Sequence, residues 1–132
     1  KCFVQGLSNR KGNIINILDQ RVLNITPYFT SYTVSKCALW TLTQSLALSL
    51  APRVKVNAIA PGPTLKSERQ SKTQFLQQIK RTPLKQQVSL QDINSSINLL
   101  LDSKSITGQL ILLDSGQNLG WAHSKSKNLI DD

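Results

Sequence analysis

The chain has 132 residues, 39% of them hydrophobic, which suits one globular domain and excludes a disordered chain. Its net charge of +9 would attract an anionic partner, but the basic residues lack the aromatic interleaving of single-strand binders, so nucleic acid is not expected. The sequence contains no apolar run of about 20 residues, the length needed to span a membrane, and no secretory leader pattern. These two features indicate a cytoplasmic protein without a membrane partner.

The first predicted elements are the end of a helix and a buried strand. Residues Lys1 to Arg10 have the pattern of a helix end, and Lys11-Gly12 follows as a stop signal. Residues Asn13 to Leu18 form a short apolar run rich in β-branched side chains and bounded by Asp19, which is typical of a buried strand. A loop is expected from there to about Thr30.

A long helix is predicted from Ser31 to Leu50, where apolar residues recur at helical spacing with little charge between them. A helix that is apolar on most sides needs cover on several faces, from its own sheet and from a partner such as another subunit. Pro52 ends the helix. Alternation over Val54 to Ala60 predicts the second strand, with a turn at Pro61-Gly62-Pro63.

The remainder of the chain predicts two more helices and a third strand. Ser67 to Arg81 predicts a mobile helix, and Ser89 with Asp92 forms a capping-box pattern that begins a helix ending at Leu101. Gln109 to Leu113 predicts the strand, and residues 117–132 are expected to be a polar tail.

Strands separated by helices of this length predict parallel crossover units and therefore an α/β fold. Three strands alone make a thin sheet, and the strand at Asn13 to Leu18 would be left with an open edge. The fold is therefore expected to continue N-terminally or in a partner chain. Residues 1–132 are accordingly expected to be a single partial domain.

Tyr32 and Lys36 carry the clearest chemical signal, since the spacing i, i+4 places them one turn apart on one face of the predicted helix. A phenol with a pKa of about 10 is a poor acid or base at neutral pH, and a nearby ammonium would lower that pKa by favouring the phenolate. Tyr32 would then transfer the proton that accompanies a hydride. Taken alone, this spacing also occurs by chance on solvated helix faces.

Asp19 and the Pro61-Gly62 turn are expected to lie near Tyr32. Asp19 ends the first predicted strand thirteen residues before Tyr32, and Pro61-Gly62 ends the next strand. The carboxyl ends of parallel strands share one edge of a sheet, where α/β proteins bind ligands. These residues are therefore expected to converge on one crevice.

This order of features resembles the short-chain dehydrogenase/reductases. The stretches GNIINI, SYTVSKCALWTLTQSLALSLAP, VKVNAIAPGPT and ITGQLILLDSGQ match that family's central strand, catalytic helix, cofactor turn and last strand. The resemblance implies the C-terminal half of a Rossmann-like doubly wound parallel sheet, with about three strands and flanking helices and the N-terminal half missing. It also implies that Tyr32 is the general acid/base, that Lys36 lowers its pKa and holds the nicotinamide ribose, and that Pro61, Gly62 and Thr64 face the nicotinamide.

The chain departs from the family's pattern at several places. Asp19 stands where the family usually has a Ser, as in the pteridine reductases, where an Asp works with the Tyr to protonate a ring nitrogen. The alternative for Asp19 is an ordinary carboxylate that ends a strand and caps a turn. Asp114-Ser115-Gly116 replaces the usual Asp-Gly-Gly, and the TGxxxGxG loop that places the cofactor pyrophosphate on a helix N-terminus is absent from the chain.

Two functions remain open at this point. The first is a fragment of an oxidoreductase that uses NADP, or less favourably NAD, to reduce a ketone or a pterin-like C=N bond, with a homo-oligomer or a complementary N-terminal half chain as its partner. The second is a catalytically inactive remnant of a split or decayed reductase gene that acts at most as an interaction module. No metal is expected, since Cys2 and Cys37 lack the spacing of a metal site.

Overall fold

The protein alternates strands and helices along the chain, as the sequence predicts. The structure is a computed structural model that describes residues 2–119. Its elements are α1 (Cys2–Gly6), β1 (Gly12–Ile17), the 3-10 helix η1 (Gln20–Val22), α2 (Thr30–Leu50), β2 (Val54–Pro61), α3 (Lys72–Lys80), α4 (Leu90–Asp102), β3 (Leu110–Leu113) and the 3-10 helix η2 (Gln117–Leu119).

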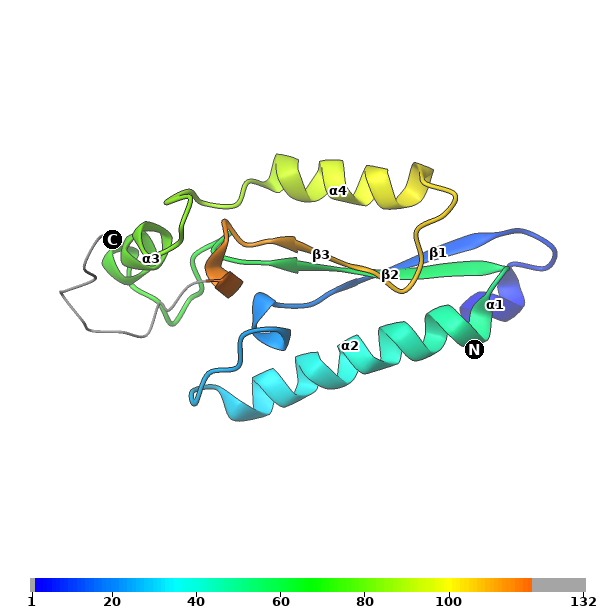
Figure 1. Cartoon of the computed structure of the whole chain (residues 1–132), viewed down its shortest axis with the longest axis horizontal. Coiled ribbons are helices and arrows are strands. Elements are labelled where there is room, and N and C mark those ends of the chain that lie inside the picture. The colour runs from blue at the N-terminus through cyan, green and yellow to red at the C-terminus, as the bar shows by residue number, and fades with distance from the viewer. Residues whose placement is uncertain (1, 120–132) are drawn as a thin grey trace, which may run out of the picture.

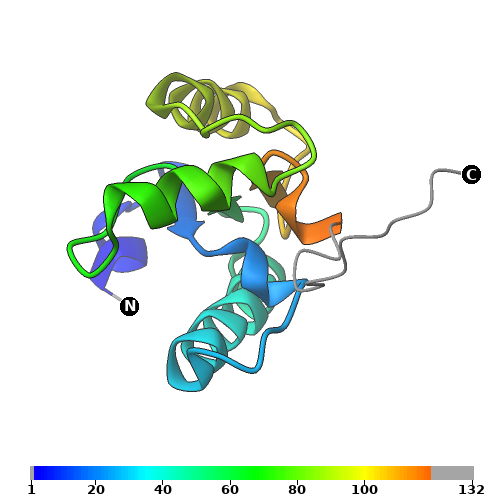
Figure 2. The same ribbon diagram turned by 90° about the vertical axis from the view of Figure 1, so that its left-hand side faces the viewer.

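The three strands form one parallel sheet in the order β1-β2-β3. In the register, Gly12 of β1 pairs with Val54 of β2, and Pro61 of β2 pairs with Leu113 of β3. Figure 1 and Figure 2 show α2 along one face of the sheet and α4 along the other. The predicted α/β fold of parallel crossover units is therefore confirmed, with helices covering both faces as a parallel sheet requires.

The core of the protein is built around the central strand β2. Val56, Ala58 and Ile59 are fully buried, because β2 is paired on both edges and covered on both faces. Burying such side chains stabilises the fold by about 25 cal/mol per Å² of apolar area. Ala47 and Leu39 of α2 pack against β2 and the residues that flank it.

Two polar side chains of β2 tie the surrounding elements to the strand. Asn57 is buried; its amide donates to the carbonyl of Ile106 at 3.0 Å, and its side-chain oxygen accepts from the backbone N–H of Gln109 at 3.0 Å. Lys55 donates to backbone carbonyls at the C-terminal end of α4. A cation suits the negative end of a helix, so Lys55 anchors α4 to the sheet.

The two later helices are both capped at their N-termini. The predicted capping box of Ser89 and Asp92 is present at the start of α4. A second capping box, formed by Ser71 and Gln74, begins α3, which is shorter than the predicted range 67–81 and has a buried apolar side that includes Phe75.

The predicted polar tail, residues 117–132, begins with ordered structure, because Gln117–Leu119 forms η2. Residues 120–132 lie outside the described part of the chain, so the remainder of that prediction is not tested. Among residues 2–119, no helix has the length and apolar character that crossing a membrane would require.

One edge of β1 has no partner strand within residues 2–119. The N–H groups of Gly12 and Leu18 donate into β2, and bonding directions alternate along a strand. The odd-numbered residues of β1 therefore direct their N–H and C=O groups to the other edge. One of these groups, the carbonyl of Ile17, accepts from the ammonium of Lys36 at 2.9 Å.

Candidate active site

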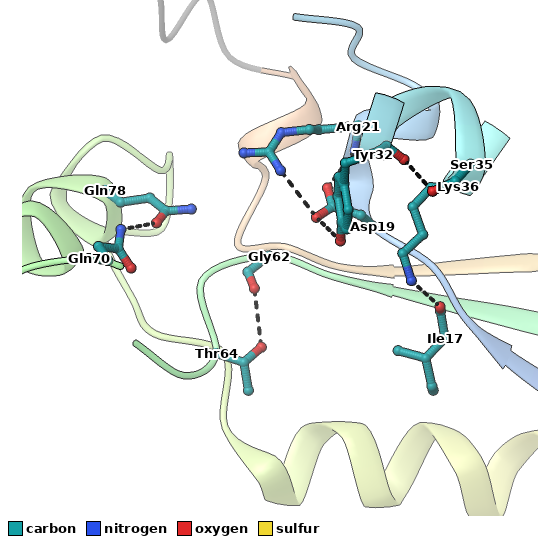
Figure 3. A network of polar contacts seen from close by, with 10 residues as sticks. All are labelled: Ile17, Asp19, Arg21, Tyr32, Ser35, Lys36, Gly62, Thr64, Gln70 and Gln78. Carbon is teal, nitrogen blue, oxygen red and sulfur yellow. Dashed lines mark hydrogen bonds and ion pairs between the residues drawn. The ribbon is translucent and has the colours of Figure 1, made fainter. Parts of the chain in front are cut away.

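The candidate site lies at the carboxyl edge of the sheet. Asp19 follows β1, Gly62 follows β2 and Asp114 follows β3, so the parallel strands deliver all three residues to the same edge. Figure 3 shows Asp19, Tyr32 and Lys36 grouped at this end, with Gly62 and Thr64 in the segment that follows β2. The predicted convergence of the first strand, the helix start and the Pro61-Gly62 turn on one edge is therefore confirmed.

The carboxylate of Asp19 makes two separate hydrogen bonds. Asp19 has an extended backbone and is the N-cap of η1, and its Oδ1 accepts from the backbone N–H of Arg21 at 2.9 Å. Its Oδ2 accepts from the hydroxyl of Tyr32 at 3.1 Å. Asp19 therefore caps a turn, as one interpretation of the sequence expects, and the same carboxylate also contacts Tyr32.

The start of α2 positions Tyr32 and Lys36. Phe29 precedes the helix in a left-handed conformation, with φ 59° and ψ 42°, and its carbonyl accepts from the N–H of Thr33 at 2.9 Å. A left-handed residue with a side chain costs about 1 kcal/mol, so the surrounding contacts hold this helix start in place. One turn into the helix, the ammonium of Lys36 lies 5.6 Å from the centroid of the Tyr32 ring.

The pKa of Tyr32 is raised above its ordinary value of 10.0. Burial is the largest cause, followed by the negative charge of Asp19 and by the hydrogen bond to Asp19, while the charge of Arg21 acts in the opposite direction. The prediction that a neighbouring lysine lowers this pKa is wrong for this structure. The pKa rises because the phenol is partly buried and donates a hydrogen bond to the Asp19 carboxylate. The Lys36 ammonium donates instead to the carbonyl of Ile17.

Arg21 belongs to the site and was not expected from the sequence. Its guanidinium Nη1 lies 3.5 Å from Oδ2 of Asp19, and its Cζ lies 5.1 Å and 5.7 Å from the ring centroids of Phe29 and Tyr32. A cavity of about 140 Å³ adjoins Arg21 and is also lined by Gln20 of η1, Phe29 and Gln117 of η2. The signal in the sequence was the spacing Asp-x-Arg directly after a strand. When the Asp caps a turn, as Asp19 does at η1, the two side chains can lie on the same side of that turn.

The turn after β2 is held by backbone contacts. The N–H of Gly62 donates to the carbonyl of Leu113 at 2.9 Å, and a Cβ on Gly62 would lie 2.8 Å from the Cα of Asp114. The hydroxyl of Thr64 donates to the carbonyl of Gly62 at 3.1 Å, and the side chain of Gln87 donates to the carbonyl of Thr64. Only glycine fits at position 62, because the backbone of the next strand approaches it so closely.

The segment Asp114-Ser115-Gly116 forms a tight turn after β3. The carboxylate of Asp114 accepts from the N–H of Gly116 at 3.0 Å and from the N–H of Asn118 at 2.7 Å. Ser115 has a φ of 55° and Gly116 a φ of 80°. Ser115 therefore adopts a left-handed conformation that a glycine would adopt without strain.

No group of three or more His, Cys, Asp or Glu side chains gathers within residues 2–119 in a way that could hold a metal ion. The site itself holds a phenol beside a carboxylate and two cations. Tyr32 is 40% exposed, so its hydroxyl can meet a substrate at the edge of the sheet. A parallel α/β sheet with such a group at the carboxyl ends of its strands belongs to the ligand-binding Rossmann-like class.

The chain belongs to the short-chain dehydrogenase/reductases. A family model described as enoyl-(acyl carrier protein) reductase matches residues 1–118. The dihydromonapterin reductase of Klebsiella pneumoniae is 31% identical over 119 residues, which are 90% of this chain and 50% of the relative.

Solved structures give the same result. The alternative dihydrofolate reductase FolM of Brucella suis, solved in complex with NADP, is 49% identical with a TM-score of 0.83 over 85% of this chain and 45% of that one. A 4-hydroxyisoleucine dehydrogenase solved with NADH is 30% identical with a TM-score of 0.79, over 89% of this chain and 52% of that one. The chain thus spans about half the length of the relatives that it matches.

Proposed function

We propose that this chain is the proton-transferring half of an NADP-dependent cytoplasmic reductase that acts on a pterin-like C=N bond or a carbonyl. The observation that carries the proposal is the hydrogen bond of 3.1 Å from the Tyr32 hydroxyl to the Asp19 carboxylate at the carboxyl edge of the sheet. An Asp at this position is the feature that resembles the pteridine reductases, and two of the relatives named above are a dihydromonapterin reductase and an alternative dihydrofolate reductase. We therefore favour a dihydropterin over a simple ketone.

The residues present fit the nicotinamide end of the cofactor. The half-exposed hydroxyl of Tyr32, the ammonium of Lys36 and the turn at Pro61, Gly62 and Thr64 all lie at one edge, and Lys36 has one recorded acceptor for its three donor positions. Lys36 and Tyr32 would hold the ribose, and the backbone after β2 would face the nicotinamide, which supplies a hydride when bound. In this proposal the phosphates bind to a Gly-rich loop outside these 132 residues.

The chain's own residues would move the proton. With a pKa above its ordinary value of 10.0, Tyr32 is protonated at neutral pH, so its hydroxyl has a proton to donate to a substrate nitrogen or oxygen as the hydride arrives. Asp19 orients the hydroxyl through Oδ2, and its Oδ1 is fixed by the N–H of Arg21. Proton loss from Tyr32 leaves a phenolate, which the nearby cations Arg21 and Lys36 would stabilise.

The open edge of β1 supports a complementary half as the partner. Within residues 2–119 the odd-numbered residues of β1 direct backbone groups to this edge, where Lys36 contacts the carbonyl of Ile17 and no strand pairs with the others, and a parallel strand would satisfy them. The relatives are about twice as long as the matched segment, so they contain the chain length that such strands need. Val34 and Leu48 of α2 are 61% and 84% exposed, and a second copy is the alternative partner for that helix.

The test is NADPH oxidation with a dihydropterin and with a generic ketone. The chain is assayed alone and mixed with the N-terminal half of the Brucella suis relative, as the part of that protein that this chain does not cover. We expect turnover in the mixture alone. Tyr32→Phe should abolish it, whereas Tyr28→Phe, at a second exposed tyrosine, should leave it largely intact.

The alternative is a catalytically inactive remnant of a reductase that acts at most as an interaction module. That candidate predicts association with the N-terminal half but neither NADPH binding nor turnover. Equal turnover in the Tyr32→Phe and Tyr28→Phe mixtures would contradict proton transfer by Tyr32.

A further inference from the structure

Arg21 lies close to Asp19 and Tyr32, which form the candidate proton donor, and to Phe29, which precedes α2. Its Nη1 is 3.5 Å from Oδ2 of Asp19, which is the same oxygen that accepts from the Tyr32 hydroxyl at 3.1 Å. Its backbone N–H donates to the other carboxylate oxygen, Oδ1, at 2.9 Å. Arg21 therefore contacts Asp19 through both its backbone and its side chain.

We infer that Arg21 is a positioning residue, whose guanidinium holds the Asp19 carboxylate against the Tyr32 hydroxyl and fixes the start of α2 through Phe29. The inference rests on the proposed function only where it treats Tyr32 as a proton donor, because the contacts themselves do not depend on turnover. It assigns to Arg21 a share of the electrostatic work that the sequence led us to expect of Lys36.

The first step of the argument concerns charge. The ionisable groups recorded beside Tyr32 are Asp19 from the turn after β1, Arg21 from η1 and Lys36 from α2. Lys36 is directed to the carbonyl of Ile17, so Arg21 is the cation that shares an oxygen with the phenol. Its charge partly neutralises Asp19 and so limits the field that opposes loss of the Tyr32 proton.

The second step concerns geometry. The guanidinium carbon lies 5.1 Å from the centroid of the Phe29 ring, within the range of a cation–π contact. Phe29 adopts the left-handed conformation that begins α2, and its carbonyl receives the first hydrogen bond of the helix, from Thr33. Arg21 thus links η1 to the helix start, and Tyr32 lies three residues after Phe29 on that start.

The test is a titration of Tyr32 in the whole chain, which needs neither cofactor nor partner. The chain has two tyrosines, so in a Tyr28→Phe background the phenolate absorbance reports Tyr32 alone. We compare Arg21→Met, which removes the charge and the donors, with Arg21→Lys, which keeps a charge. Arg10→Met, at an exposed arginine, controls for the change in net charge. Circular dichroism at each pH identifies the range in which the chain is folded.

Arg21→Met should shift the Tyr32 midpoint to higher pH, Arg21→Lys should shift it less, and Arg10→Met should leave it in place. In an Asp19→Asn background the shift caused by Arg21→Met should shrink, because the carboxylate through which Arg21 acts is gone. An unchanged or lower midpoint in Arg21→Met, or an equal shift with Asn at position 19, would overturn the inference.

A second measurement covers variants that unfold before the titration is complete. The ¹³Cζ chemical shift of Tyr32 at neutral pH reports its hydrogen bond to Asp19, and it should move in Arg21→Met and not in Arg10→Met. An unmoved resonance in folded Arg21→Met would contradict the positioning role. Loss of turnover by Arg21→Met in the assembled reductase, with an unmoved resonance, would count against the positioning role of Arg21 alone. No turnover in any variant or in the unsubstituted chain would count against the proposed function.

Discussion

Asp19 has a structural and a chemical contact at the same time. One oxygen of its carboxylate caps η1 and the other accepts a hydrogen bond from the hydroxyl of Tyr32. From the sequence these were alternatives, because residue type and spacing do not show whether one carboxylate meets one partner or two. The carboxylate has two oxygens and about four acceptor positions, so a strand-end cap and a proton-transfer partner can be the same residue.

The electrostatics of Tyr32 could not be predicted from its spacing with Lys36. An i, i+4 pair brings two side chains to one helix face, but it does not decide which acceptor the ammonium contacts. Lys36 bonds the carbonyl of Ile17, which is nineteen residues away in the chain, and the phenol bonds a carboxylate from a different element. The direction of the pKa shift follows from these tertiary contacts.

At Gly62 we expect a single added methyl group to be costly. In Gly62→Ala the new Cβ would lie 2.8 Å from the Cα of Asp114, and backbone on both sides leaves little room to relax. The free energy of unfolding should fall by about 1–3 kcal/mol, as in other overpacked sites. Urea denaturation measures this change. Gly6→Ala is the matched control, because no atom lies within 4 Å of its Cβ and the stability should stay equal or rise slightly.

Regular elements with a period or a cap were predicted well. The long helix, the three strands and the capping box at Ser89 were all visible, and their bounds agree with the structure to within one or two residues. The two 3-10 helices were missed because three residues are too few to show periodicity. Since η1 carries Arg21, the same limit hid part of the site.

The cap of α4 should contribute measurably to stability. Ser89 Oγ accepts from the N–H of Asp92 at 3.0 Å, and Asp92 returns a bond to the N–H of Ser89. Ser89→Ala removes the side-chain acceptor and should lower the free energy of unfolding by about 1 kcal/mol. Thermal or urea unfolding would show it. Ser95→Ala, at an exposed position inside the same helix, should be neutral or stabilising, so an equal loss in both variants would contradict the capping role.

Within residues 2–119, the three-stranded sheet is covered by helices on both faces (Figure 2) and has an unpaired outer edge at β1 and at β3. Helices cover both faces of β2, but within residues 2–119 β1 is paired on one edge only. The sequence indicated this open edge, because three predicted strands are too few for a doubly wound sheet. It could not indicate that a lysine of α2 would contact one of the edge carbonyls, since that contact depends on how α2 crosses the sheet.

Amide exchange should distinguish the two edges of β1. The N–H groups of Asn13, Ile15 and Ile17 are directed away from β2 and should exchange faster than those of Ile14 and Asn16, which are directed into the sheet. Hydrogen exchange by NMR measures this difference residue by residue. Addition of the N-terminal half should slow exchange at Asn13, Ile15 and Ile17. Unchanged exchange in an active mixture would show that the half docks elsewhere.

The recorded ionisable side chains around Tyr32, those of Asp19, Arg21 and Lys36, form one corner of the molecule with the carbonyl that receives Lys36, and all of these groups come from residues 17–36. This stretch contains one strand end, one turn and one helix start. The corner is therefore a local module of the chain. Because α3 and α4 contribute no side chain to the recorded contacts of this corner, we expect substitutions in those two helices to change the stability of the domain more than the arrangement of the corner.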